Sequence, residues 1–142
     1  MKAYENTHAN ILVLKRGDEL LSVLETYAND NNLTGAWLQS GLGGAGSVTL
    51  SFYDIETKKY IDKTFDQPLE IVSLNGNLSW VGGQPFWHIH GIFGTRDYQT
   101  ISGHVKALYI ALTCELLVLP IKARLMRNYD EATGLKLIYG DY

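Results

Sequence analysis

Residues 86–104, with the sequence Phe86-Trp-His-Ile-His-Gly-Ile-Phe-Gly-Thr-Arg-Asp-Tyr-Gln-Thr-Ile-Ser-Gly-His104, have the pattern of two strands joined by a polar turn. Residues 86–93 and 99–102 contain the aromatic and β-branched side chains that favour strands. Residues 94–98 between them are polar enough to turn the chain. The stretch therefore predicts a β-hairpin.

Most of the chain outside this hairpin also favours strands. Segments rich in Val, Ile, Tyr, Trp, Phe and Thr, each bounded by Gly, Pro, Asn or Asp, cover residues 36–40, 47–54, 60–65 and 69–80. Residues 108–121 could form a helix by their spacing, but their composition and Pro120 favour a long buried strand. Residues 122–128 and 135–139 predict a closing hairpin.

One helix is expected, after a first buried strand at residues 11–14. From Asp18 onward, apolar side chains recur at three- and four-residue intervals, and they are Leu20, Leu21, Val23, Leu24, Tyr27 and Ala28. Asp18 suits the N-terminal cap, and residues 29–32 suit the exit. We therefore predict an α+β fold in which a central, mainly antiparallel sheet is flanked by one main helix. A single domain over residues 1–142 is expected, with its core at about residues 8–139.

Composition narrows the class of protein. The 142 residues are 46% hydrophobic and 19% charged, which predicts a compact domain of ordinary size. Twelve Lys and Arg against fifteen Asp and Glu give a net charge of -3, which makes nucleic acid an unfavourable partner. The single cysteine, Cys114, cannot form an internal disulfide, and residues 1–10 lack a signal-peptide pattern, so we expect a cytoplasmic protein without a membrane span.

Three of the four histidines lie within seventeen residues of the chain. His88 and His90 point to the same face of a strand because side chains alternate. A hairpin centred on Arg96 places His104 opposite His88 and Ser102 opposite His90. All three imidazoles then share one face, at cross-strand spacings of about 5–8 Å. A register shift of one residue would send His104 to the other face.

Three neutral imidazoles without a carboxylate or thiolate suit a borderline divalent ion, with zinc as the first choice. Such a set leaves a fourth position open for water or for a small-molecule ligand. We therefore predict a zinc site formed by His88, His90 and His104. The alternative is that these side chains are simply packed or solvated histidines. His8 lies in the polar N-terminal segment and is assigned no role.

Two carboxylates are embedded in apolar sequence, Glu70 in residues 68–74 and Glu115 in residues 112–118. A buried carboxylate needs a partner, which could be an arginine such as Arg124 or Arg127, a subunit contact or the metal site. If Glu70 faces the histidines, it is the candidate catalytic residue, either orienting a ligand or acting as general acid and base.

The segment Gly41-Leu-Gly-Gly-Ala-Gly46 matches the glycine pattern of dinucleotide-binding loops. That pattern requires a helix directly after it, whereas residues 47–53 alternate like a strand. We therefore interpret it as a flexible or bulged connection between two strands. The alternative is a pocket wall of exposed backbone N–H groups.

Several short motifs resemble one known family. They are Lys15-Arg-Gly-Asp-Glu19, Gln39-Ser-Gly-Leu-Gly43, Leu69-Glu-Ile-Val-Ser-Leu-Asn-Gly-Asn77, Pro85-Phe-Trp-His-Ile-His90, Ser102-Gly-His104 and the strand around Glu115. From about residue 11 to residue 125 the chain resembles the PPC domain, conserved in plants and prokaryotes. The resemblance implies a homotrimer and, as in prokaryotic members, a metal held by the histidines that match His88, His90 and His104. The apolar segment 108–121 is a candidate interface between the copies.

Three functions follow as hypotheses. The first is a metal-binding homotrimeric PPC-domain protein without an assigned molecular role. The second is a zinc-dependent lyase or hydrolase acting on a small carbonyl or carboxylate compound, by similarity to the fold and site of acetolactate decarboxylase, with Glu70 transferring the proton. The third is a DNA-associated protein, since the family is often described as DNA-binding. The acidic charge and the absence of the arginine-rich AT-hook of plant members count against it.

Overall fold

The computed structural model describes residues 1–4 and 8–139, and that part of the chain forms one helix and nine strands in a single sheet. The first half contains β1 (Lys2–Tyr4), β2 (Asn10–Lys15), α1 (Leu20–Asp30), β3 (Gly35–Asp54) and β4 (Lys59–Phe65). The second half contains β5 (Leu69–Val81), β6 (Gln84–Gly94), β7 (Thr100–Ile121), β8 (Met126–Asp130) and β9 (Leu135–Tyr139).

The expected α+β class is wrong, because the chain is mostly β with one helix of 11 residues. The strand content is higher than expected because two pairs of segments, each predicted as two short strands, form single long strands. Residues 36–40 and 47–54 belong to the 20-residue β3, and residues 100–102 and 108–121 belong to the 22-residue β7, so of the expected segment 99–102 only Gln99 lies outside a strand. Both strands continue through small and polar residues because their backbone groups stay hydrogen-bonded across the β3–β7 pair, with bulges that absorb the irregularities.

The glycine-rich segment of β3 shows why no break occurs. Gly43 has a φ of 150°, and a Cβ atom there would overlap the carbonyl oxygen of Thr113 on β7. Glycine is needed at this position because the two backbones approach too closely for a side chain. The segment is therefore part of a bulged strand and not a phosphate-binding loop. The expected bulge at residues 41–46 is confirmed. The expectation that these residues connect two separate strands is wrong, because β3 is continuous through them.

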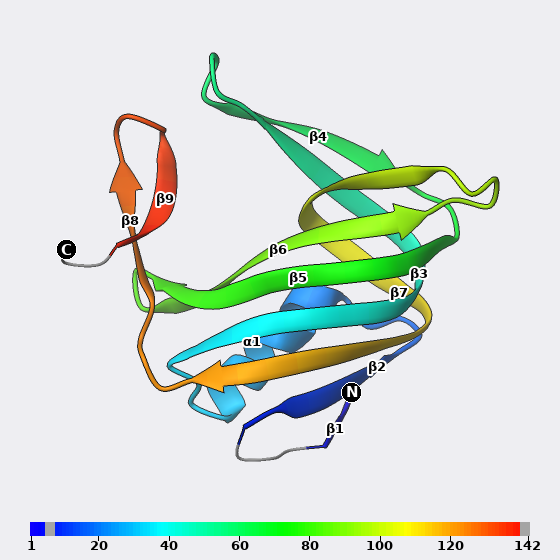
Figure 1. Cartoon of the computed structure of the whole chain (residues 1–142), viewed down its shortest axis with the longest axis horizontal. Coiled ribbons are helices and arrows are strands. Elements are labelled where there is room, and N and C mark those ends of the chain that lie inside the picture. Colours follow the sequence, from blue (N-terminus) through cyan, green and yellow to red (C-terminus); the bar gives the residue numbers. More distant parts are fainter. Residues whose placement is uncertain (5–7, 140–142) are drawn as a thin grey trace.

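The sheet is antiparallel except for one parallel contact between β5 and β8. β3 pairs with β5, β5 with β6, β6 with β7, and β7 with β3, so these four strands form a closed circuit of pairings. The long β7 makes this possible. Its first residues pair with β6, and its remainder runs between β2 and β3 (Figure 1).

Helix α1 lies against one face of the sheet and packs on β6 and β7 (Figure 1). Its buried residues are Leu20, Leu24, Tyr27 and Ala28, as the apolar stripe predicted. The N-terminal cap is Glu19, whose carboxylate accepts a hydrogen bond from the backbone N–H of Ser22 at 2.8 Å. The expected cap, Asp18, instead accepts a hydrogen bond from the backbone N–H of Lys15. The opposite sheet face carries no helix within the described residues.

Strands β8 and β9 form a hairpin after a non-strand segment at residues 122–125, which the sequence had assigned to the strand. The backbone N–H of Trp80 donates to the carbonyl oxygen of Leu125 at 2.7 Å. At the hairpin tip, the hydroxyl of Tyr53 donates to the carbonyl oxygen of Thr133, and Lys58 donates to that of Glu131. We call β8, β9 and their turn the C-terminal hairpin. It is attached at its base to β5 and at its tip to the turn region between β3 and β4.

Helix α1, the one helix in the described part of the chain, is not long and apolar enough to cross a membrane.

Candidate metal centre

Strands β6 and β7 carry the three clustered histidines on one sheet face. His90 pairs directly with His104, and His88 pairs with Asn77 of β5. The expected pairing of His88 with His104 is therefore wrong by two residues, and Ser102 pairs with Ile92 instead of His90.

The turn explains this difference. Gly94 pairs with Thr100, so the turn is centred on Asp97 and not on Arg96. The backbone N–H of Thr95 donates to the carbonyl oxygen of Gln99, and Tyr98 takes a positive φ of 62°. Because a shift of two residues preserves the face of every side chain, the three imidazoles still meet.

The imidazole rings converge closely enough for one ion. Their centroids are 5.0 Å apart for His88 and His90, 5.1 Å for His88 and His104, and 5.5 Å for His90 and His104. The Nε2 atoms of His88 and His90 are separated by 3.2 Å. Tetrahedral ligands at zinc–nitrogen distances of about 2.0–2.1 Å lie about 3.3 Å from one another. One nitrogen from each of the three rings lies within 4.8 Å of the others, so this set of donors fits a divalent ion after small side-chain adjustments.

The environment of His88 and His104 favours their neutral form, which is the form that binds metal. The pKa of His88 is lowered from 6.5 to about 4, mainly by burial, with the neighbouring Arg127, His104 and His90 acting in the same direction. Burial also lowers the pKa of His104, with contributions from His90 and Arg127, while Asp62 acts in the opposite direction. At neutral pH both side chains therefore present unprotonated nitrogen atoms.

This shift predicts that the metal-free protein loses stability in acid. Between pH 6.5 and about pH 4 the unfolded chain takes up a proton that the folded His88 does not, so the free energy of unfolding falls as pH decreases. The ring is partly exposed, so solvent screening reduces the effect to about 1–2 kcal/mol. Urea unfolding of chelator-treated protein at about pH 7 and about pH 4.5 measures it. A His88→Gln variant is expected to show a shallower pH dependence, and an identical slope in both proteins would contradict the assignment.

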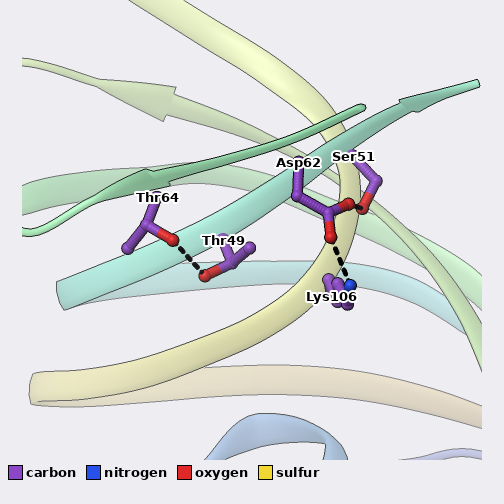
Figure 2. A network of polar contacts seen from close by, with 5 residues as sticks. All are labelled: Thr49, Ser51, Asp62, Thr64 and Lys106. Carbon is purple, nitrogen blue, oxygen red and sulfur yellow. Dashed lines mark hydrogen bonds and ion pairs between the residues drawn. The ribbon is translucent and has the colours of Figure 1, made fainter. Parts of the chain in front are cut away.

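A polar network on β3, β4 and β7 lies next to His104. Ser51 pairs with His104 in the sheet, and its hydroxyl donates to the carboxylate of Asp62 at 2.6 Å. Lys106 forms an ion pair with the same carboxylate, and Thr49 and Thr64 are hydrogen-bonded further along the two strands (Figure 2). The bonds from Lys106 and Ser51 lower the pKa of Asp62. A fixed negative charge thus faces His104, and the sequence analysis did not identify it.

Arg127, from the C-terminal hairpin, is the second contact that the sequence analysis missed. Its Nε donates to the hydroxyl of Ser79 at 2.7 Å, and its Nη2 donates to the Oδ1 of Asn77 at 3.0 Å. Nη2 also lies 3.4 Å from Nδ1 of His88. From the sequence, Arg127 was considered only as a possible partner for Glu70 or Glu115.

Neither of the two singled-out glutamates joins the histidines. Glu70 is exposed at the start of β5, where it pairs with Gly94 of β6, four residues beyond His90 and about 13 Å away along the strand. It lines a separate cleft of about 610 Å³. Glu115 is exposed on β7, opposite Val13 and Leu42. Within one chain both carboxylates are exposed, so the fold of a single copy does not bury them.

A cavity of about 310 Å³ opens beside the histidines. It is lined by His88 and His104, by Arg127, by the rings of Tyr60 and Phe86, and by residues 134–137 of the C-terminal hairpin. The Tyr60 ring lies 5.7 Å from that of His104, and the Arg127 guanidinium lies 5.3 Å from the Phe86 ring. The imidazoles therefore border a space that is partly apolar and can admit a small molecule.

A mostly β chain with three converging imidazoles on one face of its sheet defines a class of small β-sheet proteins with a candidate metal centre. The Plants and Prokaryotes Conserved (PCC) domain, abbreviated PPC above, matches residues 1–122. The chain therefore belongs to this family, as the resemblance indicated.

Several solved structures are similar over nearly the whole chain, two of them as follows. A metal-containing protein from Archaeoglobus fulgidus is 34% identical with a TM-score of 0.88, over 99% of this chain and 100% of that one. A protein from Bacteroides thetaiotaomicron, described as a candidate DNA-binding protein, is 27% identical with a TM-score of 0.92, over 97% of this chain and 96% of that one. No curated protein matches the chain.

A more distant structure bears on the enzymatic hypothesis. It is a Staphylococcus aureus protein described as similar to alpha-acetolactate decarboxylase, 12% identical with a TM-score of 0.58, over 89% of this chain and 56% of that one. At this identity the likeness concerns the fold alone.

Proposed function

We propose that the protein is a metal-binding PPC-domain protein whose ion, zinc in the first instance, is held by His88, His90 and His104. The observation that carries the proposal is the convergence of one nitrogen from each ring within 4.8 Å. The lowered pKa values of His88 and His104 support it, because neutral rings need not lose a proton to bind metal. The similarity to the metal-containing archaeal protein supports it independently.

The chemistry of such a site follows from its donors. Three neutral imidazoles leave the full positive charge of a divalent ion in place and leave one tetrahedral position open. An ion held in this way polarises a bound carbonyl or carboxylate oxygen or acidifies a bound water. Elemental analysis of the purified protein tests the proposal, with about one zinc per chain expected. A protein that binds neither zinc nor another divalent ion after chelation and reloading would refute it.

The second candidate function is a zinc-dependent lyase or hydrolase acting on a small carbonyl or carboxylate compound. The cavity that opens onto His88 and His104 favours it. Within one chain, however, Glu70 does not reach this cavity, so the proton-transfer role expected for it lacks geometric support. Incubation of the zinc-loaded protein with short 2-oxo and 2-hydroxy acids, followed by NMR, tests the enzymatic function. Turnover that requires His90 would support it.

We also propose that three copies assemble through the sheet face opposite α1, as the family resemblance implies. Side chains on this face include Ile11, Trp37 and Leu42, which are 47%, 42% and 55% exposed. Trp37 pairs with Leu119 of β7, so the apolar face includes the outer side of the segment expected to form the interface. Burial of this area between copies would remove exposed apolar surface from water.

A Trp37→Glu variant is therefore expected to shift the protein from trimer to monomer, because a charge at the centre of an apolar interface is strongly unfavourable. Light scattering coupled to gel filtration should show about a threefold lower molar mass. An Ile55→Glu variant is the control, since Ile55 is 79% exposed in the turn between β3 and β4. A monomeric wild-type protein, or a trimeric Trp37→Glu variant, would contradict the proposed interface.

DNA is not the proposed partner, although one structural neighbour carries a DNA-binding description. The net charge of -3 provides no general attraction for a phosphate backbone. A gel-shift titration at low ionic strength should show no retarded complex.

We propose a cytoplasmic location as well. The support is that Cys114, the single cysteine, is buried and unpaired, so the fold uses no internal disulfide. Cell fractionation tests this assignment.

A further inference from the structure

The C-terminal hairpin adds a positive charge to the candidate metal centre. The family match ends at residue 122, so Arg127 belongs to a segment beyond it. Its guanidinium reaches over β5 and contacts Nδ1 of His88 at 3.4 Å. The positive charge of Arg127 beside His88 therefore comes from a part of the chain that the family match does not include.

No acidic group compensates this charge within the described residues. The partners of Arg127 are the hydroxyl of Ser79, the amide oxygen of Asn77, the carbonyl oxygen of Lys136 and the ring of His88, and all of them are neutral. The ion pairs in the described ranges are Met1–Asp18 and Lys106–Asp62, and neither involves it. The Arg127 side chain is partly buried, and partial removal of a cation from water without an acidic partner is unfavourable. A half-buried cation of this kind attracts an anionic ligand.

The cavity in front of Arg127 defines the kind of anion. Its polar lining is formed by His88, His104, Arg127 and Lys136, and its apolar lining by Tyr60, Phe86 and the leucines of β9. A volume of about 310 Å³ accommodates a molecule of a few carbon atoms. A guanidinium N–H donates a strong, charge-assisted hydrogen bond to a carboxylate oxygen. Apolar walls favour an organic acid over inorganic phosphate.

We propose that this site binds a small organic carboxylate, whose carboxylate group lies on Arg127 while a second oxygen reaches the ion held by the three histidines. This inference rests on the proposed metal-binding function for the second contact. A short 2-oxo acid such as pyruvate has both groups and is the simplest ligand of this class.

Metal and carboxylate binding are coupled through His88. Its Nε2 faces Nε2 of His90, so this nitrogen is the metal donor, and Nδ1 faces Arg127. A neutral imidazole that binds metal through Nε2 carries its proton on Nδ1, and Nδ1 can then no longer accept a hydrogen bond. The N–H of Arg127 directed at Nδ1 thereby becomes available for the carboxylate. Each ligand therefore strengthens the binding of the other.

Calorimetric titration with pyruvate tests the proposal on zinc-loaded and metal-free protein. The zinc-loaded wild type should bind pyruvate more tightly than the metal-free form and more tightly than it binds inorganic phosphate. Arg127→Gln should weaken pyruvate binding by about tenfold or more, because a charge-assisted hydrogen bond is lost. Arg127→Lys retains the charge and should recover part of the affinity.

The matched control is Arg124→Gln. Arg124 precedes β8, and its guanidinium lies over the Trp80 ring at 4.5 Å, outside the cavity lining. This variant should bind pyruvate like the wild type. Circular dichroism shows whether each variant is folded, and Arg127→Lys carries the test if Arg127→Gln does not fold.

The outcomes separate the two proposals. Equal pyruvate affinity in the wild type and Arg127→Gln, or no pyruvate binding by the wild type at millimolar concentration, overturns the carboxylate site. Tighter binding of phosphate than of pyruvate overturns the ligand class. Elemental analysis of the same samples reports on the metal alone. Protein that takes up no metal but binds pyruvate in an Arg127-dependent manner would refute the metal function and retain the anion site.

Discussion

Replacing His88 and His90 together by Ala is expected to reduce the metal content of the purified protein from about one ion per chain to background. The variant loses two of the three donors whose nitrogen atoms converge within 4.8 Å, and a single imidazole does not hold zinc against solvent and buffer. Neither side chain belongs to the buried core, so the packed core remains intact and the variant should fold. Elemental analysis after extensive dialysis measures the loss.

The matched control is His8→Ala, which removes a histidine outside the cluster and should retain the metal. A His104→Ala variant tests the contribution of the neighbouring strand and is also expected to lose metal. If the double variant and the wild type contain equal metal, the ion is bound elsewhere and the assigned site is wrong.

Gly76→Ala is expected to destabilise the fold by about 3 kcal/mol and to weaken metal binding at the same time. Gly76 of β5 pairs with Ile89, which lies between His88 and His90. A Cβ atom there would overlap the carbonyl oxygen of His88 and lie 2.9 Å from Cα of Ile89. Relief of this overlap requires the two backbones to move apart, which displaces both histidines. Urea unfolding and a chelator competition for zinc measure the two effects.

Gly94→Ala is the control on the same pair of strands. Its Cβ atom would lie 3.6 Å from Cβ of Glu70, an ordinary van der Waals contact, so stability and metal affinity should change little. A Gly76→Ala variant as stable as the control would show that β5 and β6 adapt without strain and that the site does not depend on their close approach.

The histidine cluster could be predicted from the sequence because it depends on a local property. The strand pattern of residues 86–93 and 99–102 and the alternation of side chains place His88 and His90 on one face. The register relative to His104 was wrong by two residues, since a polar turn does not specify its own centre. The prediction of a common face survived because an even shift preserves it.

Features that depend on distant parts of the chain could not be predicted in this way. Arg127 reaches His88 only because the C-terminal hairpin is attached to Trp80, and Asp62 faces His104 only because β4 pairs with β3. For Glu70 the error was of the opposite kind, because a residue was expected at the site that does not reach it within one chain. Apolar neighbours in the sequence indicated burial, but strand alternation places the carboxylate in solvent. Local patterns describe a strand and its faces, whereas the pairing of strands determines which side chains meet.

The position of Arg127 beyond residue 122 separates two tasks between two parts of the molecule. The histidines belong to strands that are hydrogen-bonded on both sides, and the guanidinium comes from an appended hairpin. If Arg127 selects the ligand as proposed, substitutions in the hairpin would change ligand preference while leaving the three histidines in place. In the proposed site, residues of this hairpin would thus contribute to ligand preference, whereas strands β6 and β7 would supply the metal ligands.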